Sequence, residues 1–228
     1  MNQENTVSSV HQTGMKNVFL GCEDASPRIL FIGNSITLHF EAPDIGWNHR
    51  WGMAASAEEN DYVHRVMAGV RAVYPNADHS IAAQADWERN FWDPENTLMP
   101  TFAARDWKPD VVIVRLGENT PPKEFAGHDY VAAVCEMARF YASCGADIIV
   151  TDQFWPCEET DSRLMEAARI LGAEAVKLSD LGADISNTAA GLFRHGGVAC
   201  HPGDKGMNAI AERILEKLMP LLARRMAE

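Results

Sequence analysis

RILFIGNSIT, residues 28–37, joins a continuous apolar run to a glycine, an asparagine and a serine. Residues 29–32 are all apolar, and no polar position alternates with them. Such a run is typical of a parallel strand that is buried on both faces. The pattern therefore predicts a central strand whose carboxyl end leads directly to Ser35.

Further apolar runs predict the other strands of the same sheet, and amphipathic stretches between them are long enough for crossover helices. The predicted strands are 29–32, 80–83, 111–116, 147–151 and a fainter 174–178, with 15–20 as a possible edge strand; the predicted helices are 62–74, 130–143, 163–171 and 205–225. This alternation predicts an α/β fold, a three-layer α/β/α sandwich with a mainly parallel sheet of about five strands. We expect one domain over 28–228, preceded by an N-terminal arm and lead-in over 1–27.

Composition and charge narrow the range of partners. The chain has 228 residues, of which 46% are hydrophobic, and its formal net charge is −12. Nucleic acid and anionic membrane surfaces attract basic proteins, so we expect this acidic chain to bind neither. A small neutral substrate, such as an acylated sugar, is easier for an acidic protein to accommodate than an anionic polymer. The sequence also leaves open that the chain forms a homo-oligomer.

The cysteines and the N-terminal residues bear on the compartment. The five cysteines are scattered and do not show the paired spacing of a disulfide scaffold. Residues 1–5 are polar and do not resemble a signal peptide, and no apolar run is long enough to cross a bilayer. We therefore expect a cytoplasmic protein. The spacing of Cys157, His195, Cys200 and His201 matches no usual zinc pattern, so we expect no metal and no other cofactor.

Three polar residues occur in an order that suits acyl transfer. Ser35 follows a strand and, if a helix begins there, its hydroxyl faces the rim of the sheet while its N–H points outward. Asn119 follows the strand 111–116, and a side-chain amide is a standard donor to a developing alkoxide. His201 lies on a loop before the last helix, where an imidazole can act as general base. A nucleophile, an oxyanion donor and a base are thus candidates at one rim.

Each of these residues also has a plain structural explanation. A serine after a strand is commonly a helix cap, and an asparagine before Pro121-Pro122 commonly forms a turn. The chain has eight histidines, and any one of them is more often a solvent-exposed residue than a catalytic base. The acyl-transfer interpretation depends on the joint order and on the placement at strand ends. Ala85, which follows the strand 80–83, is a further candidate oxyanion donor through its backbone N–H, on position alone.

Tryptophans are concentrated in two stretches, residues 38–59 and 86–108, which we expect to be ordered insertions near the strand ends. Trp51, in the first stretch, and Trp155, after the strand 147–151, are the candidate substrate-binding residues. An indole ring can stack on a sugar or simply pack an insertion, and both alternatives stay open.

Together these residues resemble the SGNH (GDSL-like) hydrolase superfamily. Residues 33–35 are similar to the block that carries its nucleophilic serine, residues 117–119 to the block of its asparagine donor, and residues 201–202 to the block of its histidine base. The resemblance covers about residues 28–222 and implies a flavodoxin-like three-layer fold and metal-free acyl hydrolysis. Residues 33–40, 51–56 and 61–64 look similar to a branch of bacterial SGNH proteins, many of which are regarded as carbohydrate esterases.

Three positions depart from the family pattern. The aspartate of the first block is Asn34 here, and the glycine of the second block is Ala85, a change that preserves the backbone N–H. The aspartate that usually stands three residues before the histidine is replaced by Val198. Either Ser35 and His201 form a dyad, with the imidazole held by a backbone carbonyl, or an acid arrives from the rim loop. The candidate acids on that loop are Asp152, Glu158 and Glu159; we favour the dyad.

The sequence thus predicts a serine esterase that removes short acyl groups, with acetyl favoured, from a carbohydrate or similar polar alcohol. Ser35 and His201 are its expected catalytic residues, and the oxyanion hole is expected from Ser35, Asn119 and Ala85. The alternative is a non-catalytic carbohydrate-binding or regulatory protein on the same fold. It is suggested by Val198, which stands where the family has its aspartate.

Overall fold

The computed structural model describes residues 18–94, 98 and 101–227. Of the predicted N-terminal arm and lead-in, residues 1–17 lie outside this part of the chain. Val18 and Phe19, which belong to the predicted edge strand 15–20, are described and pair with the sheet.

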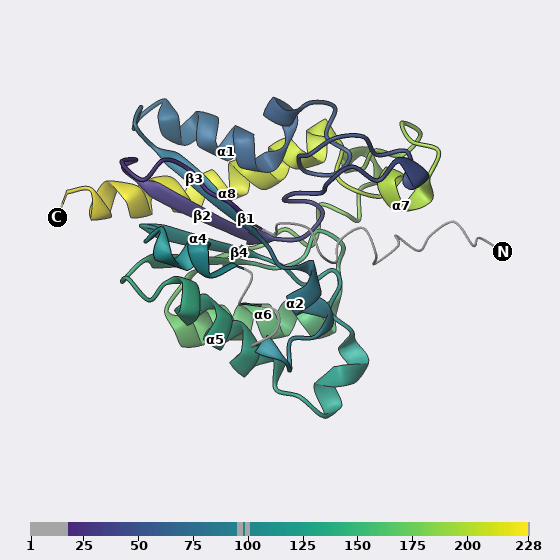
Figure 1. The fold of residues 1–228 in the computed structure, drawn as a ribbon. Helices are drawn as coiled ribbons and strands as arrows, with labels where there is room; N and C mark the ends of the chain where they lie inside the picture. Colours follow the sequence, from purple (N-terminus) through teal and green to yellow (C-terminus); the bar gives the residue numbers. More distant parts are fainter. Residues whose placement is uncertain (1–17, 95–97, 99–100, 228) are drawn as a thin grey trace.

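A central sheet organises the described residues (Figure 1). Its strands are β1 (Val18–Phe19), β2 (Arg28–Gly33), β3 (Asp78–Ala83), β4 (Val111–Arg115), β5 (Asp147–Thr151) and β6 (Glu174–Val176). They lie in the order β1-β3-β2-β4-β5-β6, and all neighbours are parallel except β1 and β3. The predicted mainly parallel sheet is confirmed, and the short edge strand brings it to six strands.

Helices cover both faces of the sheet. They are α1 (Tyr62–Arg71), α2 (Ala85–Arg89), α4 (Phe102–Asp106), α5 (Tyr130–Tyr141), α6 (Glu158–Leu171), α7 (Gly196–Ala199) and α8 (Asp204–Arg225). Helices α1 and α8 lie on one face, and α4, α5 and α6 lie on the other (Figure 1). The three-layer α/β/α prediction is therefore confirmed. Among the described helices, none is both long enough and apolar enough to span a bilayer.

The four predicted helices are present, and three short ones were not predicted. Helices α2, α4 and α7 have only four or five residues each, too few for a helical period to show in the sequence. Helix α6 begins at Glu158, before the predicted start at residue 163. The first turn was missed because its side chains are mainly acidic and show no apolar period. Acidic side chains suit a helix N-terminus, where they face the positive end of the dipole.

Residues 29–32 of strand β2 are all apolar because both faces of the strand are buried there. Ile29 and Phe31 pack in the cluster beneath α1 and α8, whereas Leu30 and Ile32 pack in the cluster beneath α5 and α6. All four side chains are fully buried. This explains why the sequence of the strand does not alternate.

The strand register brings three connections to one rim. Gly33, at the end of β2, is paired with Ala83 at the end of β3 and with Arg115 at the end of β4. The chain leaves these aligned positions toward Ala85, Ser35 and Asn119. In open parallel sheets the ligand site lies at this edge.

Candidate active site

Ser35 and His201 are hydrogen-bonded to one another. The Oγ atom of Ser35 lies 2.8 Å from Nε2 of His201, across 166 positions of sequence. Ser35 is half-buried and His201 is buried. The imidazole is thus held against the hydroxyl before any substrate is bound.

Ser35 lies in a turn, which corrects the expectation that it opens a helix. The carbonyl of Asn34 accepts hydrogen bonds from Thr37 N at 2.9 Å and Leu38 N at 3.0 Å. The chain then continues in extended form to a bridge at His39 instead of winding further. The turn closes directly over Gly33, where a Cβ atom would stand only 1.8 Å from Thr37 Oγ1. The turn therefore requires a glycine at position 33, two residues before Ser35.

A backbone carbonyl holds the other edge of the imidazole. Nδ1 of His201 donates to the carbonyl of Gly197, in the short helix α7, at 2.6 Å. Because a carbonyl can only accept, the proton of the neutral ring is on Nδ1. Nε2 is then unprotonated and accepts from the Ser35 hydroxyl. This arrangement has the polarity that a general base needs.

None of the candidate acids contacts His201. Asp152 accepts hydrogen bonds from the backbone N–H groups of Leu178 and Ser179. Glu158 and Glu159 are exposed on the first turn of α6. Nδ1 of His201 contacts the Gly197 carbonyl instead.

The position of the missing aspartate is part of an apolar cluster. Val198 is fully buried and packs with residues of the loop after Ser35 and with Ala189. The loop members of the cluster are Ala42, Ile45, Trp47, Met53 and Ala54. An ionised carboxylate at this place would lose its hydration without gaining a partner.

Burial keeps the imidazole neutral. Burial is the main cause that lowers the pKa of His201 to about 3; the hydrogen bond to the Gly197 carbonyl opposes it, and the nearby His39 and Arg115 act in the same direction as burial. A neutral imidazole is the form that can accept a proton from serine. His201 is therefore unprotonated at neutral pH.

Asn119 has a defined amide orientation. Its Nδ2 donates to Glu88 Oε2 at 2.6 Å, and its Oδ1 accepts from Arg89 Nη2 at 3.0 Å. The amide nitrogen carries two hydrogens, and the described residues take up one of them. The second remains available to an oxyanion.

The backbone N–H groups of Ser35 and Ala85 complete the set of predicted donors. Ala85 is the first residue of α2, and the preceding Gln84 N donates to Gly33 O at 2.7 Å. This bond ties the start of α2 to the end of β2. Within the described part of the chain, neither Ser35 N nor Ala85 N donates to a backbone acceptor.

A buried polar network behind these residues was missed by the sequence analysis. Asn34 Nδ2 donates to Glu88 at 3.0 Å and to Glu118 at 2.6 Å, and Arg115 donates to Asn34 Oδ1 and to Glu118. Glu88 and Arg115 are fully buried. Glu88 gave no signal in the sequence, because it lies in the expected insertion 86–108 and its partners are far from it along the chain.

The two candidate tryptophans lie in different surroundings. The ring of Trp155 stands edge-on to His201, with centroids 5.5 Å apart. Trp51 stacks on His49 at 4.2 Å, and its Nε1 donates to Ala55 O at 3.0 Å. The structure thus brings Trp155, and not Trp51, into contact with the predicted base.

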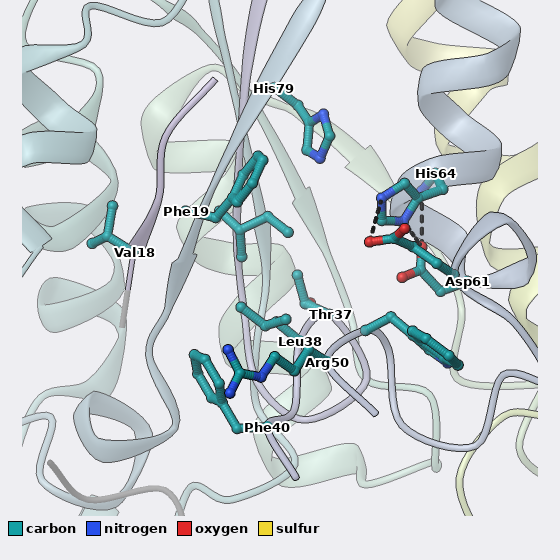
Figure 2. Close-up of a pocket in the computed structure, with 12 residues that line it drawn as sticks. Val18, Phe19, Thr37, Leu38, Phe40, Arg50, Asp61, His64 and His79 are labelled. Atoms are coloured by element: carbon teal, nitrogen blue, oxygen red, sulfur yellow. Dashed lines mark hydrogen bonds and ion pairs between the residues drawn. The ribbon is translucent and has the colours of Figure 1, made fainter. Parts of the chain in front are cut away.

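Trp51 contributes to a cavity of about 230 Å³ whose lining includes neither Ser35 nor His201. Figure 2 shows its apolar side, with Phe19 and Leu38, and its polar side, with His64 held by Asp61.

Several solved structures share this fold at low sequence identity. A two-domain esterase (CEX) active on acetylated mannans has a TM-score of 0.55 and 16% identity, over 86% of this chain and 50% of that one. The psychrotrophic esterase EstA from Pseudoalteromonas sp. has a TM-score of 0.54 and 11% identity, over 87% of this chain and 100% of that one. The lipase/acylhydrolase from Enterococcus faecalis has a TM-score of 0.54 and 13% identity, over 85% and 95%.

The chain spans about half the length of the mannan esterase. No protein-family model matches the sequence, and no curated protein matches it. The chain therefore has the three-layer α/β/α fold of these esterases and lipases, which is the fold that the resemblance to SGNH hydrolases implied.

Proposed function

We propose that this protein is a serine esterase that removes short acyl groups, with acetyl favoured, from a carbohydrate or similar polar alcohol. The observation that carries the proposal is the hydrogen-bonded line from Ser35 Oγ through His201 to the Gly197 carbonyl. A serine hydroxyl, an imidazole in the required tautomer and an acceptor for its far edge make up a nucleophile with its base.

Acylation begins with attack of Ser35 Oγ on the ester carbonyl carbon, while the hydroxyl proton passes to Nε2 of His201. The Nδ1–H of the resulting imidazolium stays on the Gly197 carbonyl. The N–H groups of Ser35, Ala85 and the Asn119 amide donate to the oxyanion. The carbon–oxygen bond to the leaving group then breaks, and Nε2 returns its proton to the alkoxide.

Deacylation repeats these steps with water. Nε2 of His201 takes a proton from water as its oxygen attacks the acyl carbon. The tetrahedral intermediate collapses with release of the carboxylic acid, and the proton on Nε2 returns to Ser35 Oγ. Every step uses one imidazole that alternates between base and acid.

The substrate class is supported by charge, by Trp155 and by the neighbours. A net charge of −12 disfavours anionic polymers and suits a neutral ester. Trp155 offers an indole beside the base, and such rings can pack on the apolar face of a sugar. One solved neighbour acts on acetylated mannans.

Fluorophosphonate labelling of the intact protein, located by peptide mass spectrometry, tests the proposal. We expect one adduct, on Ser35, and loss of aryl-acetate turnover in Ser35→Ala, with an unchanged unfolding temperature in that variant. A folded protein without an adduct would instead support a carbohydrate-binding or regulatory protein that lacks the chemistry. Calorimetry with neutral oligosaccharides then measures that binding.

A further inference from the structure

Glu88 is a buried carboxylate whose contacts are all hydrogen-bond donors. Its side chain is 0% exposed. Oε1 accepts from Asn34 Nδ2 at 3.0 Å, from Gly117 N at 2.5 Å and, more weakly, from Asn119 N at 3.4 Å. Oε2 accepts from Asn119 Nδ2 at 2.6 Å. Burial and the nearby Glu118 raise the pKa of Glu88, and the hydrogen bonds from Asn119, Gly117 and Asn34 oppose them by stabilising the ionised carboxylate.

These contacts connect two sides of the predicted oxyanion hole. Glu88 lies on α2, the helix that Ala85 opens. It binds Asn34, the residue before the nucleophile, and it binds both the backbone and the side chain of Asn119. The connections after β2, β3 and β4 are thus joined by one side chain.

Glu88 and Arg89 together determine which way the Asn119 amide faces. A flipped amide would place its oxygen against the carboxylate and its NH₂ against the guanidinium, and both contacts would be repulsive. With the observed orientation, one N–H is used by Glu88 and the other is directed elsewhere. The amide is thus fixed before any charge develops, which is the condition for efficient oxyanion stabilisation.

We infer that Glu88 is a positioning residue of the oxyanion hole, holding the Asn119 amide so that its second N–H meets the developing alkoxide. This inference rests on the proposed esterase function. Glu88 itself touches neither Ser35 nor His201 in the described contacts. Its effect on the reaction passes through Asn119.

Glu88→Gln separates this role from general support of the fold. A glutamine retains one acceptor oxygen, and its NH₂ must face a former donor. If the NH₂ replaces Oε1, three hydrogen bonds are lost; if it replaces Oε2, only the bond to Asn119 Nδ2 is lost. The glutamine therefore settles with its NH₂ toward Asn119, and the variant selectively releases that amide.

The expected kinetic result is a split between kcat and KM. Loss of one oxyanion donor costs about 10²- to 10³-fold in kcat, so a donor that is present but misdirected should cost about 10- to 100-fold. KM should change little, because the ground-state ester carries no oxyanion. Asp152→Asn is the matched control: it makes the same chemical change in a buried carboxylate that accepts the backbone N–H groups of Leu178 and Ser179 rather than any group of Asn119. Its kcat should remain near that of the wild type.

A double-mutant cycle gives the decisive test. If Glu88 acts only through Asn119, Glu88→Gln should have almost no further effect on kcat in an Asn119→Ala background. Multiplied losses in the double variant, or a wild-type kcat in Glu88→Gln alone, would overturn the inference. The same comparison with Asp152→Asn shows whether lost stability alone lowers kcat.

A second readout does not depend on turnover. The side-chain amide signal of Asn119 in a ¹⁵N NMR spectrum, assigned by its absence in Asn119→Ala, should shift and exchange faster in Glu88→Gln. An unchanged signal would contradict the inference even if Ser35 proved to be inactive. Unlabelled Ser35 together with a shifted amide would instead reject the proposed function while leaving the contact with Glu88 established.

Discussion

The carbonyl oxygen of Gly197 accepts a hydrogen bond from Nδ1 of His201 at 2.6 Å, one residue before the position where the family resemblance calls for an aspartate. The carbonyl fixes the same tautomer that an aspartate would fix. It does so without placing a buried carboxylate beside the buried, neutral imidazole. The short helix α7 supplies this acceptor, and Val198 within it anchors the helix in the apolar cluster.

Restoring the family residue should therefore harm the protein. In Val198→Asp, a carboxylate would replace a fully buried side chain among apolar neighbours. We expect a loss of about 3 kcal/mol or more in the free energy of unfolding, typical of a buried charge without a partner, and reduced esterase activity. Chemical denaturation and aryl-acetate kinetics measure the two effects. Val198→Ala, which removes apolar contacts without adding charge, is the control. A rise in kcat/KM in Val198→Asp would show that the carbonyl is a poor substitute for the acid.

Stability should depend on His201 at mildly acidic pH. Burial lowers the pKa of this imidazole to about 3, whereas in the unfolded chain it has its ordinary value of 6.5. Between these values, the unfolded chain binds a proton that the folded protein does not. The free energy of unfolding should therefore fall as the pH falls from 6.5, by at most about 1.4 kcal/mol per pH unit from this group. Above pH 6.5 the contribution should be constant.

Urea denaturation at about pH 7 and about pH 5 measures this slope, and His201→Gln isolates the share of the histidine. The variant should lose less stability between the two pH values than the wild type. Equal slopes would mean that the imidazole is protonated in the folded protein. For the same reason, the acid limb of kcat/KM should lie well below the ordinary pKa of histidine.

The fold could be predicted because the strands of this sheet are buried on both faces. Residues 29–32, 111–114 and 148–150 are apolar without alternation, and the structure places a strand at each of them. Parallel register then brings their carboxyl ends to one rim, as general rules for such sheets require. For this reason Ser35 and Asn119 could be placed near each other from position alone.

Other parts of the site could not be predicted, since they depend on contacts between distant segments. The carbonyl of Gly197 reaches His201 because α7 is a single helical turn, too short to leave a periodic pattern. Glu88 is buried because donors from Asn34 and Asn119 converge on it, and neither donor is near it in sequence. Hydrogen-bond partners of this kind are set by the assembled tertiary structure.

Gly117 should be intolerant of a side chain. Its φ angle is +136°, a conformation that side chains rarely adopt, and an added Cβ would lie 2.6 Å from Gln153 Cγ. Gly117→Ala should cost about 1–3 kcal/mol in unfolding free energy through backbone strain. Its kcat should also fall, because the segment that leads to Asn119 must shift. Gly127→Ala is the matched control: its φ of −110° suits any residue, and no atom lies within 4 Å of the added carbon. Equal behaviour of the two variants would show that the turn at Gly117 adjusts freely.

The two candidate tryptophans should respond differently to substitution. Trp155 stands edge-on to His201, so Trp155→Ala should impair both binding of a sugar acetate and the placement of the base. We expect a raised KM and a lowered kcat. Trp51 is engaged by His49, Trp47 and the carbonyl of Ala55, so Trp51→Phe should lower the unfolding temperature with little change in KM.

Kinetics with an acetylated oligosaccharide and with a small aryl acetate separate these effects. Trp155→Ala should be impaired with both substrates if it positions His201, and more strongly with the oligosaccharide if its ring also contacts sugar. Trp51→Phe should behave like the wild type with both. If Trp51→Phe instead raised KM for the oligosaccharide alone, the cavity that Trp51 lines would be part of the substrate site. Its distance from Ser35 and His201 would then indicate where a longer sugar chain extends.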